Sequence, residues 1–230
     1  MIYKRLSLFA GHYGSGKTNI AVNFAKHIKR NEQNVAIADL DIVNPYFRTK
    51  DSEKELNELG IELIVSKFAN SNVDAPALPA EIYSVVTDKN IFGVLDIGGD
   101  DRGALALGRY TPYILSDGNY EMYFVVNNAR PLTRNAADTI EIMQEIEIAS
   151  GLRFTSIVNN SNIGAETTAE YVLKSTEYVK EISDKTGLNV AFTSVKSDLY
   201  DELSDKIPDL FPLNIQKLYY QENCKSISTQ

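Results

Sequence analysis

Residues 11–18 read GHYGSGKT and match the pattern G-x-x-x-x-G-K-[ST], in which a glycine-rich loop holds phosphate groups. An apolar run at residues 6–10 precedes the loop and is typical of a buried strand, while residues 20–25 after it have the spacing of a packed helix. The pattern requires this order of strand, loop and helix. The sequence therefore predicts a site for a nucleoside triphosphate.

Each position of the loop has an expected task. Glycines permit backbone torsions and close approaches that a Cβ would block, so successive N–H groups can surround a phosphate, and the helix that begins near Lys17 adds its positive end. We expect Lys17 to reach the β- and γ-phosphates, Thr18 to place its hydroxyl on Mg²⁺, and the amide of Asn19 to meet the α-phosphate. The nucleotide-binding residues predicted in this segment are Gly11, His12, Tyr13, Gly14, Ser15, Gly16, Lys17, Thr18 and Asn19.

The composition predicts one nucleotide-binding domain over residues 1–230. The chain of 230 residues is 43% hydrophobic and contains no linker-like stretch. Its net charge of −8, without a cluster of Lys and Arg, argues against a nucleic-acid partner. No apolar run approaches the ~20 residues of a membrane span, and none resembles a secretory signal, so we expect no membrane partner. The single cysteine, Cys224, agrees with a reducing compartment, and the expected location is the cytoplasm.

Apolar runs alternate with helical patterns along the rest of the chain. Such runs, separated by helices, indicate an α/β fold with a doubly wound, mostly parallel sheet. Ligands of these sheets bind beyond the carboxyl ends of the strands, so the loops after the strands are the expected place for chemistry. The predicted strands are residues 35–38, 61–65, 92–95, 122–126, 154–158 and 190–192, and the predicted helices are 133–149, 167–182 and a core-docking segment at 213–220.

Acidic side chains follow two of these strands. Asp39 and Asp41 are two residues apart, so both point to the same side of an extended segment, where one could hold the water shell of a metal and the other could orient an attacking water. Asp96 closes another strand and is the candidate that holds Mg²⁺ through a water. Gly99 could bring its N–H to the γ-phosphate. A solvated acidic turn is the alternative at both loops.

Three segments together resemble the MinD/ParA-like branch of P-loop ATPases (CobQ/CobB/MinD/ParA), which also includes ArsA-related ATPases and nucleotide-dependent metallocentre-maturation proteins. They are GHYGSGKT at residues 11–18, DLDIVNPYFR at 39–48 and VLDIGGDD at 94–101. The resemblance covers about residues 5–200 and implies the P-loop nucleoside triphosphatase fold.

The resemblance also implies roles for the acidic residues. It places Asp39 near the metal, makes Asp41 the residue that orients the hydrolytic water, and makes Asp96 the water-mediated partner of Mg²⁺. Lys17 and Asp41 are then the catalytic residues of a magnesium-dependent ATPase.

One position departs from that family. The family has a second lysine directly after the first glycine of the loop, which reaches the nucleotide of a partner in a dimer, whereas this chain has His12. An imidazole is shorter and donates in a pH-dependent way. Formation of a nucleotide-sandwich homodimer is therefore an open question. His12 itself could contact the γ-phosphate, Arg48 or Arg102 could replace the missing charge, or His12 only shapes the loop.

The expected base is adenine. The chain lacks the N-K-x-D sequence with which GTPases of this general class identify guanine. In the resembling ATPases an asparagine after this late strand meets the adenine, so Asn159 is the predicted contact, with residues 195–198 as the opposite wall. Capping of a turn is the alternative use of this asparagine. ATP, with Mg²⁺, is thus expected rather than GTP.

Two functional classes follow from these residues. The first is an ATPase switch whose loops at residues 39–48 and 96–102 engage a protein partner of unknown identity. The second is a small-molecule kinase or ATP-dependent ligase in which Asp41 activates an acceptor. We favour the switch because the resemblance is to switch proteins and no acceptor-binding motif is visible. Tight ATP binding without turnover would indicate a binding module.

Overall fold

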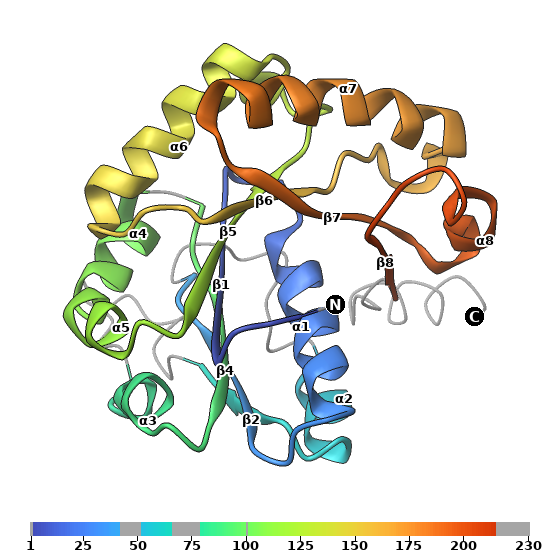
Figure 1. Cartoon of the computed structure of the whole chain (residues 1–230). Helices are drawn as coiled ribbons and strands as arrows, with labels where there is room; N and C mark the ends of the chain where they lie inside the picture. The colour runs from blue at the N-terminus through green and yellow to red at the C-terminus, as the bar shows by residue number, and fades with distance from the viewer. Residues whose placement is uncertain (1, 42–51, 66–78, 100, 215–230) are drawn as a thin grey trace, which may run out of the picture.

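A computed structural model describes residues 2–41, 52–65, 79–99 and 101–214 of the chain (Figure 1). In this part of the chain all strands join one parallel sheet in the order β3-β2-β4-β1-β5-β6-β7-β8. The strands are β1 (Leu6–Ala10), β2 (Val35–Asp39), β3 (Glu62–Ile64), β4 (Phe92–Asp96), β5 (Tyr120–Val126), β6 (Ser156–Asn159), β7 (Asn189–Lys196) and β8 (Leu210–Leu213).

Helices cover both faces of this sheet. They are α1 (Lys17–Lys29), α2 (Glu53–Glu58), α3 (Glu81–Thr87), α4 (Asp101–Gly108), α5 (Thr111–Asp117), α6 (Ala136–Ser150), α7 (Ala169–Thr186) and α8 (Tyr200–Leu203). Leu6 and Leu8 of β1 belong to the apolar layer that contains residues of α3 to α7, whereas Phe9 belongs to the layer of α1 and α2. Alternate residues of a strand point to opposite faces, so this arrangement buries β1 on both sides.

The predicted α/β fold with a parallel sheet is confirmed. Each predicted strand overlaps an observed one, and the helices predicted at residues 133–149 and 167–182 correspond to α6 and α7. Strand β8 was not predicted, and Leu213, the expected start of a helix, instead ends that strand. Pro212 explains the miss because proline cannot donate to a ladder. It is tolerated here since, among the described strands, β8 pairs only with β7 and forms the edge of the sheet. Residues 215–220 lie outside the described part of the chain.

Arg5 contacts α3, α5 and the turn before β4 at the amino end of the sheet. Its side chain is 4% exposed and lies 2.9 Å from Asp117 at the end of α5. The guanidinium also donates to backbone carbonyls at the end of α3 and in the turn that leads to β4, those of Val85, Val86, Asp88 and Ile91. A buried charge of this kind is tolerated because each donor has an acceptor.

We expect Arg5→Ala to lower the free energy of unfolding by about 3–5 kcal/mol, because it leaves Asp117 and the carbonyls without their buried partner. Urea denaturation measures the change. Lys89→Ala is the control: its ammonium lies 4.0 Å from Asp117 but its side chain is 79% exposed, so the loss should stay below about 1 kcal/mol. Equal losses in the two variants would contradict this assignment.

None of the helices in the described ranges combines the length and apolar character needed to cross a bilayer.

Candidate functional site

The glycine-rich loop joins β1 to α1 at the carboxyl edge of the sheet. Gly14 and Gly16 have φ angles of 77° and 86°, a left-handed conformation that residues with a Cβ rarely adopt. The N–H of Ser15 donates to the carbonyl of His12 over 3.0 Å, which closes the turn. The loop therefore has the curled backbone that the sequence pattern predicts, with the first turn of α1 directly behind it.

Lys17, in the first turn of α1, lies next to the carboxylates that follow β2. Its Nζ is 3.5 Å from Oδ2 of Asp41, and both side chains are at most 6% exposed. The N–H of Asp41 donates to Oδ1 of Asp39 over 2.8 Å. We predicted from the sequence that Lys17, Asp39 and Asp41 lie close together. The structure places them in one buried group.

Asp96 joins this group from the neighbouring strand. Asp39 and Asp96 are register partners in the parallel pair β2 and β4, and the N–H of Leu40 donates to the backbone carbonyl of Asp96 over 2.8 Å. The Asp96 side chain is fully buried. The pairing of the two strands thus brings together carboxylates that are 57 positions apart in the chain.

The crowding of these carboxylates changes their chemistry. Burial, with a further contribution from the negative charge of Asp96, raises the pKa of Asp39 from its usual 3.8 to about 8, although Lys17 and the N–H of Asp41 act against the change. Among the described residues of this group, the carboxylates outnumber the one cation, Lys17. An additional cation at this place would lower the cost of burying the carboxylates.

The oxygen donors at this place suit a magnesium ion that keeps part of its water shell better than a metal ion held entirely by protein ligands. In the parts of the chain that the structure describes, no group of three or more His, Cys, Asp or Glu residues is placed to hold a metal ion. Mg²⁺ keeps several of its waters and uses one or two carboxylates together with phosphate oxygens. Thr18, Asp39 and Asp96 supply the hydroxyl and carboxylate oxygens that this mode of binding uses.

The loop after β4 packs directly on the glycine-rich loop of residues 11–18, called the phosphate loop from here on. A Cβ added to Gly99 would lie 2.7 Å from the backbone nitrogen of Tyr13 and 3.0 Å from the carbonyl oxygen of Gly11, so any larger residue would push the two loops apart. Gly99 is thus next to the loop, as expected. The contact of its N–H with a γ-phosphate stays a prediction.

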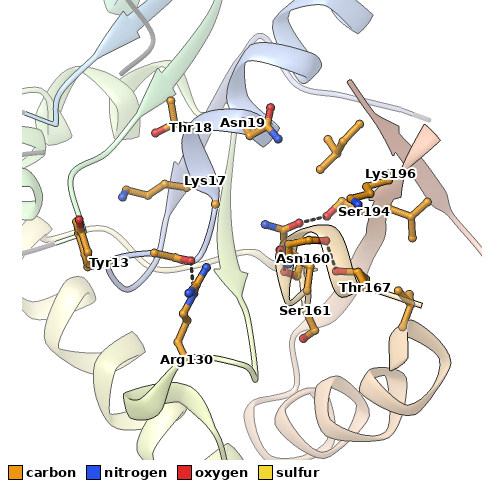
Figure 2. A pocket seen from close by; sticks show the side chains of 17 residues that line it. Tyr13, Lys17, Thr18, Asn19, Arg130, Asn160, Ser161, Thr167, Ser194 and Lys196 are labelled. Carbon is orange, nitrogen blue, oxygen red and sulfur yellow. Dashed lines mark hydrogen bonds between the residues drawn. The ribbon is translucent and has the colours of Figure 1, made fainter. Parts of the chain in front are cut away.

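A cavity of about 450 Å³ opens between this loop and the ends of β6, β7 and β8. Figure 2 shows Tyr13, Lys17 and Arg130 at one end and Asn160, Ser194 and Lys196 at the other. Pockets that hold small ligands commonly measure about 300–1,000 Å³. The cavity is therefore large enough for a ligand that begins at the phosphate loop and extends toward β7.

Asn160, and not Asn159, faces this cavity. Nδ2 of Asn160 donates to the carbonyl of Ser15 over 2.6 Å, and its Oδ1 accepts from Ser194 over 2.7 Å. Asn159 is fully buried, and its Nδ2 donates to Ser175 on α7 over 2.9 Å. The side chain of Asn159 thus points into the α7 layer, and Asn160 is the asparagine of this pair that lines the cavity, while a contact with a base stays a prediction.

From the sequence, His12, Arg48 and Arg102 are the candidates to act in place of the second lysine that the resembling family has in its loop. His12 is half-buried, and burial together with the nearby Lys17 lowers the pKa of its imidazole below the usual value. Arg102, in α4, is exposed and does not line the cavity, while Arg48 lies outside the described residues. The structure instead shows Arg130, whose Nε donates to the carbonyl of Gly14 over 2.8 Å. No sequence motif marks Arg130, because its place depends on β5 lying next to β1.

Comparison with solved structures finds proteins of the same fold. The chain matches no protein-family model and no curated protein. Among solved structures, FtsY of Thermotoga maritima has a TM-score of 0.55 at 15% identity, over 83% of this chain and 61% of that one. FtsY of Elizabethkingia anophelis, a signal recognition particle receptor solved with GDP, has a TM-score of 0.51 at 16% identity, over 85% and 58%. Chloroplast FtsY of Physcomitrella patens has a TM-score of 0.54 at 15% identity, over 84% and 59%.

The chain has the fold of P-loop nucleoside triphosphatases. Identities this low support the fold alone, and the chain spans about three fifths of the length of these neighbours. The neighbours are FtsY proteins, so the MinD/ParA-like branch that the sequence resembles stays a prediction.

The raised pKa of Asp39 predicts a pH-dependent stability. The folded chain keeps a proton that the unfolded chain releases near pH 3.8, so the contribution of Asp39 to stability is full below that pH and is lost as the pH rises to about 8. Without nucleotide, the melting temperature of the wild type should fall over this range more steeply than that of Asp39→Asn, whose amide does not ionise. Calorimetry at a series of pH values measures both slopes, and identical slopes would contradict the assignment.

Proposed function

We propose that this protein binds ATP together with Mg²⁺, hydrolyses it, and uses the bound nucleotide as a switch toward a protein partner. The observation that carries the proposal is the Lys17–Asp41 pair at the mouth of a glycine-rich loop, in a chain with the P-loop nucleoside triphosphatase fold. Buried ion pairs contribute little net stability, so their presence beside a cavity favours a functional role.

The phosphates would lie in the loop between β1 and α1. The N–H groups around Gly14 and Gly16 and the positive end of α1 suit an anion. Lys17 lines the cavity and would exchange its contact with Asp41 for one with the β- and γ-phosphate oxygens. Asn19 also lines the cavity, near the expected α-phosphate. Binding of the triphosphate would thus break one buried ion pair and replace it with another.

Mg²⁺ would be held by the hydroxyl of Thr18, with Asp39 and Asp96 acting through waters. Its positive charge would neutralise the phosphate oxygens and the buried carboxylates. Asp39 would give up its proton when the ion binds, because the cation removes the repulsion that raises its pKa.

Asp41 would orient the attacking water. Once Lys17 turns to the phosphates, the carboxylate of Asp41 is released from its 3.5 Å contact and can accept a proton from a water in line with the γ-phosphate. Asp41 lies two residues after the end of β2 and pairs with Lys17, so its surroundings would depend on whether a phosphate occupies the loop. This dependence is the proposed switch, and Gly99 would provide the second contact that changes on hydrolysis.

The base end of the cavity favours adenine. Val172, Val195 and Leu213 provide apolar surface, and no described residue that lines the cavity is an Asp or Glu. Guanine carries N–H donors on its edge that a carboxylate satisfies best, so a site without one discriminates against it. Asn160 and Ser161 offer amide, hydroxyl and backbone groups for the adenine edge. Because one FtsY neighbour was solved with GDP, GTP is the competitor to test.

A protein partner, with a homodimer as one form of it, follows from the switch. The loops at the carboxyl edge would change with the nucleotide, and such changes are read by proteins that bind one state better than the other. A small-molecule kinase or ligase is the alternative. It would use the same Asp41 to activate an acceptor hydroxyl or carboxylate, so an acceptor would be needed for turnover.

The direct test of catalysis is Asp41→Asn, which keeps the shape of the side chain but removes the carboxylate. Phosphate release in the presence of Mg²⁺ should fall by about 100-fold or more, whereas ATP should still bind. Asp205→Asn, an exposed carboxylate between α8 and β8, should leave turnover unchanged.

Equal turnover by the wild type and Asp41→Asn would contradict the hydrolytic role. Phosphate transfer that begins only when a small-molecule acceptor is added, and is lost in Asp41→Asn, would favour the kinase or ligase.

A further inference from the structure

A bound triphosphate would need more positive charge than the loop at residues 11–18 supplies by itself. Lys17 is the ammonium group of the loop, and it already pairs with Asp41. His12 adds little charge at neutral pH because burial and Lys17 lower its pKa. A transferring phosphoryl group spreads negative charge over its outer oxygens, and phosphoryl-transfer sites commonly stabilise this charge with an arginine.

Arg130 brings a second positive charge to the same loop. It follows β5 and lines the cavity together with Lys17 (Figure 2). Its Nε donates to the carbonyl of Gly14 over 2.8 Å, and a Cβ added to Gly14 would lie only 3.3 Å from that nitrogen. The guanidinium therefore packs against the wall of the phosphate loop, where Gly14 leaves room for it.

Hydrogen bonds to Asn127 fix the backbone around Arg130. The N–H of Arg130 donates to the carbonyl of Asn127 over 3.2 Å, and the hydroxyl of Thr133 donates to the same carbonyl over 2.6 Å. Oδ1 of the fully buried Asn127 accepts from the N–H of Ala129 over 3.0 Å. Pro131 follows, and its ring limits the torsions of the turn. The Cα of Arg130 is thus held in place without a ligand.

The guanidinium has donors to spare. Arginine offers five N–H donors in a planar fork, and the hydrogen bond to Gly14 uses the one on Nε. Within the described ranges, neither Nη nitrogen donates to another protein group. The side chain is exposed on its outer side, so water occupies these donors until an anion replaces it. A phosphate oxygen suits such a fork better than it suits an ammonium.

Other cations of the described chain are less well placed. Lys196 lines the cavity at the end of β7, on the side of Asn160 and Ser194. Arg134 follows one turn after Arg130, is exposed, and does not line the cavity.

We propose that Arg130 binds the terminal phosphate of a nucleoside triphosphate held by the same chain. The inference rests on the proposed function, because it assumes that the loop holds the phosphates. It adds a residue that distinguishes a triphosphate from a diphosphate: contact with the last phosphate strengthens binding of the former and is absent for the latter. During hydrolysis the same contact would stabilise charge on the transferring group.

The test measures dissociation constants by calorimetry for a non-hydrolysable ATP analogue and for ADP, each with Mg²⁺. Arg130→Gln keeps a neutral donor but removes the charge. It should weaken binding of the ATP analogue about tenfold or more, and change that of ADP by less than about threefold, as expected for loss of one charged hydrogen bond. Arg130→Lys should be intermediate because it keeps the charge without the fork. Arg134→Gln, the matched control, should bind both nucleotides like the wild type.

The outcomes separate this inference from the proposed function. Equal weakening of both nucleotides in Arg130→Gln would show that Arg130 only shapes the loop, and unchanged binding of both would show that it has no contact with the ligand. Either result overturns the inference while the wild type still binds nucleotide. A wild type that binds neither nucleotide would overturn the proposed function and this inference together.

Discussion

The parallel register of β1, β2 and β4 is the constraint on which the site depends. It aligns Phe9 of β1 and Asp39 of β2 with Asp96 of β4, so that the carboxyl ends of three strands stop at one edge. A slip of one residue would turn each side chain to the opposite face of the sheet. The apolar layers on both faces oppose such a slip, since each strand residue fits only one layer. The hydrophobic core thus determines where the carboxylates meet.

The site itself works against stability. Asp39, Asp41 and Asp96 are all at most 7% exposed, with Lys17 as the nearby positive charge. Burying like charges together raises the free energy of the folded state, and the increased pKa of Asp39 is one expression of this cost. A ligand that brings Mg²⁺ and accepts Lys17 would relieve it. The proposed nucleotide site would therefore respond to binding, as the proposed switch requires.

The sequence predicts those parts of the site that depend on local order. The phosphate loop follows from strand, glycines and helix in one short stretch, and Asp39 and Asp96 follow because each directly ends an apolar run. Asn160 could not be separated from Asn159 in this way. Ile157 and Val158 belong to opposite apolar layers, so alternation along β6 puts Asn159 on the side of Ile157 and α7, but the sequence does not tell which side α7 covers.

Contacts between residues far apart in the chain could not be predicted from the sequence. Arg130 reaches the phosphate loop because β5 pairs with β1, an arrangement that no local pattern of Arg130 reveals. Strand β8 likewise exists because the edge of β7 accepts a short segment that contains Pro212. In both cases tertiary pairing decides the outcome, whereas local residues carry a weak or contrary signal.

The central claim is that the loop at residues 11–18 binds a nucleoside triphosphate. The most direct measurement is an equilibrium titration of the full chain with a non-hydrolysable ATP analogue and Mg²⁺, repeated with the matching GTP analogue and with Lys17→Ala. The account predicts saturable binding of one nucleotide per chain, tighter for the ATP analogue, and about tenfold or more weaker in the variant because a charged contact is lost. Absence of saturable binding by the wild type, or equal binding by Lys17→Ala, would contradict it.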